Sequence, residues 1–370
     1  MANHTLSCCL VIRNESEKII KCLNNINILA DEIIVVDTGS DDGTPNAVKN
    51  WATKLNASSN VKVIEVGKRF HDEDGDFNFG AAKTFAFSQA TKDFVMWMDA
   101  NDNVTQQLNV KKFFLEQTKK NPNVYFAMPT ALSDDYAFGR VRIAPREKCW
   151  MEGRVHEYMK INDPSLTRIF APFPIQNRKP GRDLERNLRL LLKEWKDNPT
   201  ARMCFYIAQT YNEMHNDEEA FRWFKRRICT FEFLHEFAEE HFKSMECFAE
   251  FIATGRKFDN VNEDDLKDIA EQMIKMEPTR IEGYYYLGKY YLTKREYEKA
   301  LDQFRKYGTC KRPAFYSLWL NKNLYGGRAI RNAIDECRMG IKYKDVIQPE
   351  QILDYGPQSL SYKVGEGQYQ

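Results

Sequence analysis

Short apolar runs that end in polar residues dominate the first hundred residues, and this pattern constrains the fold more than any other feature. Four runs have the length and composition of buried strands: 6–12, 32–36, 61–66 and 94–98. Stretches with helical periodicity separate them at 17–28, 44–55 and 80–90. Strands that alternate with helices indicate βαβ units and a mostly parallel sheet. The N-terminal part is therefore predicted to be an α/β domain.

Three of the four predicted strands end in polar residues suited to ligand binding, at 13–15, 37–40 and 99–102. In open parallel sheets the ligand lies beyond the carboxyl ends of the strands, so these loops should converge on one pocket. A carboxylate such as Asp37 can accept hydrogen bonds from a pyrimidine or ribose edge. Alternatively, Asp37 and Ser40 only cap the following helix. The second acidic loop, at 99–102, favours a ligand pocket.

The segments 11–15 (VIRNE) and 31–44 (DEIIVVDTGSDDGT) resemble the opening of family 2 glycosyltransferases of the GT-A fold. The resemblance is to the branch that carries tetratricopeptide repeats after the catalytic domain, and it is strong over about the first hundred residues. It implies an α/β GT-A domain that binds a nucleotide sugar. The implied donor-binding residues are Ile12, Asn14, Glu15, Asp37, Thr38, Ser40, Lys83 and Asp99.

The segment 94–102 (FVMWMDAND) resembles the DxD region of this family, which supplies oxygen ligands for a divalent metal. Asn101 replaces the second aspartate of the motif, and Asp102 follows it. An amide oxygen binds metal more weakly than a carboxylate, so either Asp102 takes over or the site is weaker. The resemblance implies Mn or Mg held by Asn101, Asp102 and His156.

Two further segments resemble family motifs. In 78–84 (NFGAAKT), Lys83 stands where the family has its basic residue, whereas Asn78 and Thr84 depart from the usual Asp and Asn. A cation near a helix start suits a diphosphate, although a solvated lysine is the alternative. In 150–157 (WMEGRVHE), the resemblance implies Glu157 as the general base, with Glu152 as a substitute. A purely structural His–Glu pair is the alternative.

After about residue 172 the sequence has the periodicity of helices almost throughout. The stretch 172–181, which contains proline, glycine and charged residues, is predicted to be a domain boundary. Tyr206, Tyr211, Ala220 and Phe224 recur 80 residues later as Tyr286, Tyr291, Ala300 and Phe304, and Pro199 recurs 79 residues later as Pro278. Tetratricopeptide repeats have a period of about 34 residues, which leaves room for one divergent pair at 235–276. We expect a GT-A domain at 1–175, repeats at 182–345 and a flexible tail at 346–370.

Composition excludes few partners. The 54 Lys and Arg residues balance the 53 Asp and Glu residues, which gives no global sign of a nucleic-acid or membrane-surface protein. Basic residues cluster locally, either as solvated faces and ion pairs or as contacts for a phosphate-rich acceptor; they are Arg140, Arg142, Arg146, Lys148 and Arg154, then Arg222, Lys225, Arg226 and Arg227. Nine scattered cysteines and the lack of a signal sequence or membrane span favour a cytoplasmic protein.

The sequence thus predicts an inverting, metal-dependent glycosyltransferase with a nucleotide-sugar donor, expected to be a UDP-sugar. A peptide or protein is the favoured acceptor, followed by a glycan and then a modified nucleic-acid base. The repeats would form an acceptor-docking or homodimer surface. One alternative is a repeat scaffold whose enzyme domain has lost its chemistry, suggested by Asn101 and Thr84. A nucleotidyltransferase is a weaker alternative.

Overall fold

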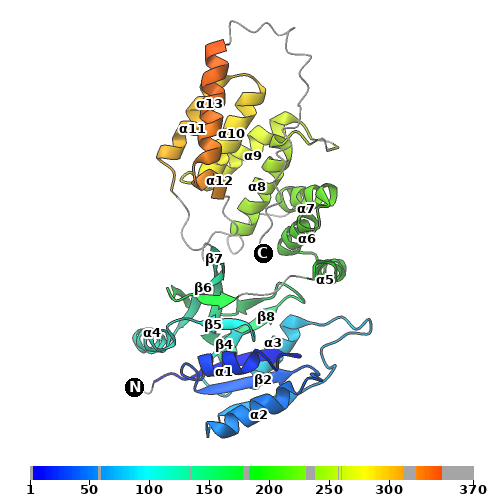
Figure 1. Ribbon diagram of the computed structural model, residues 1–370, viewed down its shortest axis with the longest axis vertical. Helices are drawn as coiled ribbons and strands as arrows, with labels where there is room; N and C mark the ends of the chain where they lie inside the picture. Colours follow the sequence, from blue (N-terminus) through cyan, green and yellow to red (C-terminus); the bar gives the residue numbers. More distant parts are fainter. Residues whose placement is uncertain are drawn as a thin grey trace, which may run out of the picture. The chain divides into compact units, whose positions relative to one another are not determined.

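The computed structural model describes residues 3–56, 60–133, 136–177, 183–230, 238–256, 258–259, 261–311 and 322–343 (Figure 1). The expected tail at 346–370 lies outside this range. The chain divides into two compact units, the first running to Phe248 and the second from Ala249. The division differs from the boundary expected near residue 175–182, because the first helices after the sheet belong to the first unit.

The four N-terminal strands form a parallel sheet in the order β3-β2-β1-β4. The strands are β1 (Leu6–Ile12), β2 (Glu32–Asp37), β3 (Val61–Glu65) and β4 (Phe94–Met98). The intervening helices are α1 (Ile19–Ile26), α2 (Thr44–Lys54) and α3 (Phe79–Ser88). Each element lies within two residues of its predicted bounds. The predicted α/β architecture is confirmed.

The sheet continues past β4 as a mixed sheet, in the order β4-β7-β6-β11-β5, with β10 pairing β6. The added elements are β5 (Asp102–Val104), α4 (Gln107–Lys120), β6 (Val124–Ser133), β7 (Tyr136–Pro145), β10 (Thr167–Phe170) and β11 (Ile175–Asn177). Strand β11 lies inside the stretch predicted as a domain boundary. Its antiparallel pairing with β5 places Asn177 opposite Asp102.

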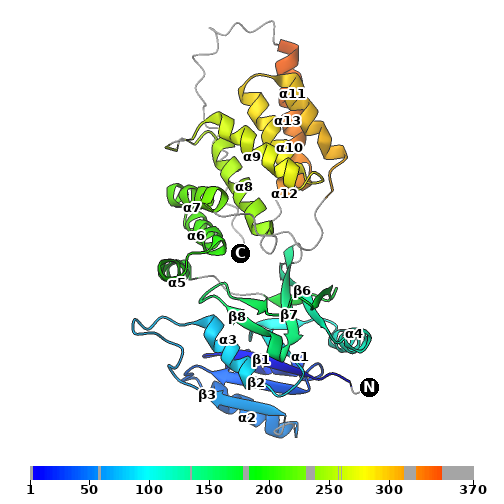
Figure 2. The same ribbon diagram turned by 180° about the vertical axis from the view of Figure 1, so that it is seen from behind.

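The two faces of the sheet bury separate apolar cores. Helices α1, α2 and α4 cover one face through residues such as Leu23, Trp51 and Phe114. Helix α3 covers the other face through Ala86 and Phe87, which pack against Trp97 of β4 (Figures 1 and 2). Because β1, β2 and β4 are buried on both faces, they are apolar at nearly every position. The polar residues are therefore confined to the ends of the strands.

A short hairpin packs against α3 and completes this side of the domain. It follows a 3-10 turn (Arg146–Lys148) and consists of β8 (Cys149–Glu152) and β9 (Tyr158–Ile161). The Thr84 hydroxyl donates to Met151 O at 3.2 Å and accepts from Met151 N at 2.9 Å. A Cβ on Gly80 would lie 2.4 Å from Gly153 O. Helix α3 and the hairpin are thus in direct backbone contact.

Beyond Asn177 every described element is helical. The first unit contains α5 (Leu184–Asp197), α6 (Ala201–Glu213), α7 (Asp217–Thr230) and most of α8 (Ala238–Ala253). The second contains α9 (Glu263–Met276), α10 (Ile281–Thr293), α11 (Tyr297–Arg305), a 3-10 turn (Lys306–Gly308), α12 (Lys322–Tyr325) and α13 (Arg328–Tyr343). No helix among the described residues is long and apolar enough to cross a membrane.

The repeat seen in the sequence is present in the backbone. The pair α10–α11 begins 80 residues after the pair α6–α7, and Ala220, Ala300, Phe224 and Phe304 are all buried. The turn between the two helices of each pair contains one residue with a left-handed backbone conformation. This residue is His215 (φ 59°) between α6 and α7, and Arg295 (φ 56°) between α10 and α11. Helices α8 and α9 supply the pair between them. The predicted divergent pair at 235–276 matches these two helices.

The contact between α3 and the hairpin generates a prediction for Gly80→Ala. The added methyl group meets a backbone carbonyl that cannot rotate away, so the free energy of unfolding should fall by about 1–3 kcal/mol despite alanine's better helix propensity. Chemical denaturation followed by circular dichroism measures this loss. Gly308→Ala is the control, because nothing lies within 4 Å of the added atom. Equal stability of the two variants would contradict the packing described here.

Candidate functional site

The loops after β1 and β2 form one hydrogen-bonded rim centred on Asp37. Its side chain is buried, and Oδ1 accepts from the amides of Gly39 at 3.0 Å and Ser40 at 2.9 Å. The Ser40 hydroxyl donates to Oδ2 of Asp37 and accepts from Asn14 N at 2.9 Å. Thr38 donates to Ile12 O at 3.0 Å. Five of the predicted donor-binding residues therefore lie together, namely Ile12, Asn14, Asp37, Thr38 and Ser40.

Asp37 does not cap the following helix, which was the structural alternative. Helix α2 begins after Gly43, and its Thr44 amide donates to Asp42 rather than to Asp37 or Ser40. Thr44 also accepts from Glu15 N at 2.9 Å, which places Glu15 on the same rim. The hydrogen bond from the Thr44 hydroxyl, aided by those from Ser16, holds the pKa of Asp42 well below its ordinary value. Asp37 stabilises the loop that follows β2.

Lys83 forms the centre of a second cluster at the end of β4. Its side chain is only 6% exposed, and Nζ lies 2.9 Å from Asp99 Oδ1 and 2.7 Å from Glu157 Oε1. Nζ also lies 4.3 Å from the centre of the Trp97 ring. Burial by itself lowers the pKa of Lys83, but the two carboxylates outweigh burial and the net pKa is raised. Lys83 is therefore a buried cation, not the solvated lysine of the alternative interpretation.

Asp102, predicted as a metal ligand, has its carboxylate engaged by protein groups. It is fully buried, and Oδ2 accepts from Arg142 Nη1 at 2.8 Å and from Asp99 N at 2.9 Å. Oδ1 accepts from the side-chain amide of Asn177. A metal at Asp102 would have to displace these donors. The structure therefore places Asp102 as a support of the 99–102 loop, while the neighbouring Asn101 remains half-exposed.

His156 and Glu157 are adjacent in sequence but line different pockets. Glu157 contributes to a pocket of 740 Å³ whose aromatic lining includes Trp97 and Tyr206. His156 lines a smaller pocket of 220 Å³, where its ring stacks on Tyr206 at a centroid distance of 4.1 Å. Its backbone is left-handed, with φ 54°. The structure thus groups Glu157, not His156, with Lys83 and Asp99.

Glu152, the substitute base, lies in the same small pocket as His156. Its carboxylate accepts from Tyr158 at 2.8 Å and pairs with Lys160 at 2.8 Å. Burial raises its pKa, but the hydrogen bonds from Lys160 and Tyr158 outweigh burial and hold the pKa below its ordinary value. The Glu152 carboxylate is therefore engaged by Tyr158 and Lys160 of the neighbouring strand β9.

Sequence reasoning missed the roles of Arg142 and Asn177. Arg142 lies fully buried with its guanidinium carbon 3.7 Å from the centre of the Trp97 ring and donates to Thr130 at 3.1 Å. The sequence had placed it in a local basic cluster of solvated faces and ion pairs, and Arg227 in a second such cluster; both side chains are in fact buried. Strand alternation in β7 gave no reliable signal, because the pairing of β7 with β6 shifts register at Arg142, between Val141 and Ile143. Asn177 gave no signal, because its partner depends on the pairing of β11 with β5.

The buried Asp102–Arg142 pair predicts that Asp102→Asn acts on stability. Removing one partner of a buried ion pair leaves a desolvated charge, so the free energy of unfolding should fall by about 3–5 kcal/mol. Denaturant titration measures this, with Asp163→Asn as a control that removes a surface pair with Lys148 and should leave stability almost unchanged. A stable Asp102→Asn variant that no longer responds to Mn²⁺ would instead identify Asp102 as a metal ligand.

Comparisons with known proteins agree with this architecture. Residues 7–179 match the family model described as Glycosyl transferase family 2. A TPR repeat-containing protein of Synechococcus elongatus is 31% identical over 99 residues, covering 27% of this chain and 21% of that protein. The glycosyltransferase SunS of Bacillus phage SPbeta is 23% identical over 244 residues, covering 60% of this chain and 53% of SunS. The chain thus spans about half or less of the length of these relatives.

The solved structure of Staphylococcus aureus TarS 1–349 with UDP-GlcNAc is 13% identical and covers 82% of this chain and 90% of TarS 1–349, with a TM-score of 0.38. Because that score is low, the assignment rests on the family match and on the sheet described above. Residues 7–179 contain all the strands of the large sheet except the first residue of β1, together with the Asp37 rim and the Lys83 cluster. The N-terminal half of this chain is a family 2 glycosyltransferase domain.

Proposed function

We propose that this protein transfers a sugar from a UDP-sugar to an acceptor nucleophile, with inversion at the anomeric carbon. The observation that carries the proposal is the pair of clusters at the carboxyl ends of β2 and β4 in a family 2 domain: buried Asp37 in one, and Lys83 with Asp99 and Glu157 in the other. One cluster suits a nucleoside, and the other suits a diphosphate and the reacting sugar.

The Asp37 rim is suited to the base and ribose of the donor. A carboxylate has about four acceptor positions, and three hydrogen bonds from Gly39 and Ser40 leave capacity for an N–H of the base. Asn14 and Thr38 are fixed on the same rim by hydrogen bonds to Ser40 and Ile12. A rim held by its own hydrogen bonds is preorganised, which reduces the cost of ordering it around a ligand.

The charges near Lys83 support a requirement for a divalent cation. The cluster holds three carboxylates and three cations, namely Asp99, Asp102, Glu157, Lys83, Arg140 and Arg142. These charges cancel, so this group leaves the charge of a diphosphate uncompensated. Asp99 and Asn101 supply hard oxygens there, and we propose them as ligands of Mn²⁺ or Mg²⁺. When bound, the cation would stabilise the departing diphosphate.

Glu157 is the proposed general base, because it joins the donor cluster to the 740 Å³ pocket. An acceptor in that pocket would present its nucleophile to a carboxylate positioned by Lys83. The pocket combines aromatic groups such as Tyr125 with charged groups such as Arg168 and Glu239, which suits a peptide or protein acceptor. We propose the helical repeats as the surface on which this acceptor docks.

A panel of nucleotide sugars tests the proposed donor. Purified protein with Mn²⁺ or Mg²⁺ should release a nucleoside diphosphate from one UDP-sugar, measured by chromatography. Asp37→Asn should weaken donor binding by about 10- to 100-fold, because it removes one charge-assisted hydrogen bond. Binding without release from any donor, even with candidate acceptors, would favour the scaffold alternative that Asn101 suggests. Release of pyrophosphate would favour a nucleotidyltransferase.

Glu157→Gln and Glu152→Gln form a matched pair for the base assignment. Glu157→Gln should lower turnover by about 10²- to 10⁴-fold with little change in donor affinity, because the amide cannot accept the proton. Glu152→Gln should stay within about threefold, because its carboxylate lies in a different pocket from Glu157. Turnover of both variants with a soluble acceptor provides the measurement. Greater loss in Glu152→Gln would reverse the assignment.

A further inference from the structure

We propose that Arg154 is a positioning residue that fixes Glu157 relative to Lys83, by tying the Glu157 loop to the start of α3 and to the first helix after the sheet. The inference rests on the function proposed above. Arg154 itself lies outside the cluster of groups that would contact the substrate, although it lies in the 150–157 segment and its partner Phe79 lies in the 78–84 segment, both of which resemble family motifs.

Arg154 uses its side chain, its amide and its carbonyl to connect three segments. The guanidinium Nη1 lies 2.9 Å from Asp72 Oδ2 in the loop between β3 and α3. The backbone amide donates to Glu194 Oε2 of α5 at 2.9 Å. The carbonyl accepts from Phe79 N, the first residue of α3, at 3.0 Å. Arg154 and Asp72 are each less than one quarter exposed, so water screens their pair only in part.

These contacts act at a short distance from the reacting groups. Phe79 is one helical turn before Lys83, and Arg154 is three residues before Glu157. Between them, the close approach of Gly80 to Gly153 O leaves no room for adjustment. A shift of the 153–157 loop would therefore be transmitted to the Lys83–Glu157 pair, whose atoms are 2.7 Å apart.

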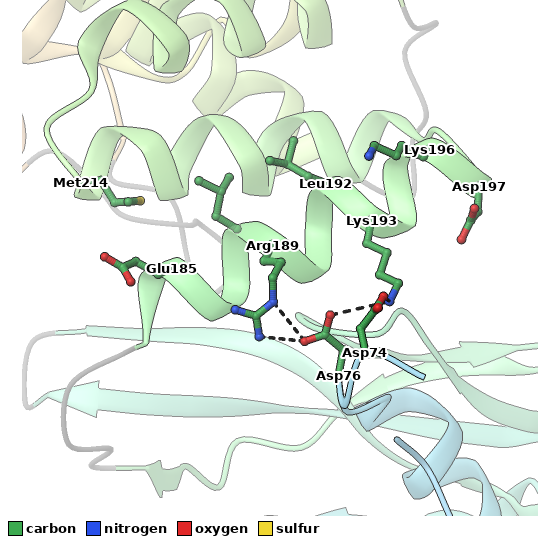
Figure 3. Close-up of a pocket in the computed structure, with 10 residues that line it drawn as sticks. Asp74, Asp76, Glu185, Arg189, Leu192, Lys193, Lys196, Asp197 and Met214 are labelled. Carbon is green, nitrogen blue, oxygen red and sulfur yellow. Dashed lines mark hydrogen bonds and ion pairs between the residues drawn. The ribbon is translucent and has the colours of Figure 1, made fainter. Parts of the chain in front are cut away.

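The partner of Arg154 belongs to an acidic group that α5 neutralises. Asp72, Asp74 and Asp76 lie close enough together to resemble a metal site. Instead, Lys193 pairs with Asp72 at 2.7 Å and contacts Asp74, and Arg189 Nη2 lies 2.7 Å from Asp76. Figure 3 shows Asp74 and Asp76 directed toward these two side chains of α5.

Three carboxylates thus face three cations, counting Arg154. The hydrogen bond from Lys193, with those from the Asp76 amide and Arg154, holds the pKa of Asp72 well below its ordinary value. A cation at this group would have to displace all three basic side chains. We therefore assign it as an ion-pair junction that supports Arg154.

The test compares Arg154→Ala, Arg154→Lys and Arg189→Ala in the full chain. Arg154→Ala should lower kcat for release of the nucleoside diphosphate by about 10- to 100-fold through misplacement of the base, with the Kd for UDP within about twofold. Arg154→Lys retains the charge and should recover turnover to within about threefold of the unmodified chain. Arg189→Ala loses a pair in the same junction but does not touch the 153–157 loop, so its kcat should be unchanged.

Hydrogen exchange gives a readout that does not depend on activity. Arg154→Ala should speed exchange in peptides covering 79–84 and 150–157, and Arg189→Ala should not. Unchanged exchange and kcat in Arg154→Ala would overturn the proposal. So would equal loss of kcat in Arg154→Ala and Arg189→Ala, because it would indicate a general loss of stability. If the unmodified chain turns over no nucleotide sugar, the proposed function fails, while the exchange experiment still decides whether Arg154 positions the two segments.

Discussion

The ion pairs of Lys83 with Asp99 and Glu157 are the interaction on which the site depends. They join α3, the loop after β4 and the loop after the hairpin strand β8, three segments far apart in sequence. A buried lysine is costly unless charged partners surround it, so the geometry of all three segments is coupled to that one ammonium group. The same arrangement places a carboxylate, Glu157, where the Lys83 cluster meets the 740 Å³ pocket.

In the acidic loop after β4, Asp102 supports the loop backbone, whereas Asp99 and Asn101 are the residues proposed to bind the metal ion. Asp102 accepts from Arg142, Asn177 and the Asp99 amide, and these bonds fix the path of residues 99–102. Asp99 Oδ1 pairs with Lys83 at 2.9 Å, and Asn101 is half-exposed. Replacement of a carboxylate by Asn101 weakens any cation site there, and the buried Lys83 supplies a permanent positive charge beside it.

The helices after the sheet are part of the support of the site. Helix α5 contacts the loop before α3 through Arg189 and Lys193, and it contacts the 153–157 loop through Glu194. Residues from α6 line both pockets near Glu157 and His156, with Tyr206 common to the two. Helices α5 and α6 therefore both contact the loop that carries Glu157, through Glu194 to the Arg154 amide and through Arg202 to the His156 carbonyl.

Local pattern was enough to predict the strands and helices of the first hundred residues, because strands buried on both faces must be apolar and polar residues are then confined to their ends. For the same reason, Asp37 and Asp99 were found from the sequence. The 80-residue repeat was also visible, because each helix pair must bury the same small and aromatic positions. Only the tertiary structure decided which carboxylates are bound by basic side chains and amides of the protein itself. Asp102 is fixed by Arg142 and Asn177, and His156 and Glu157 enter different pockets, because long-range strand pairing and helix packing choose the partner of each charge.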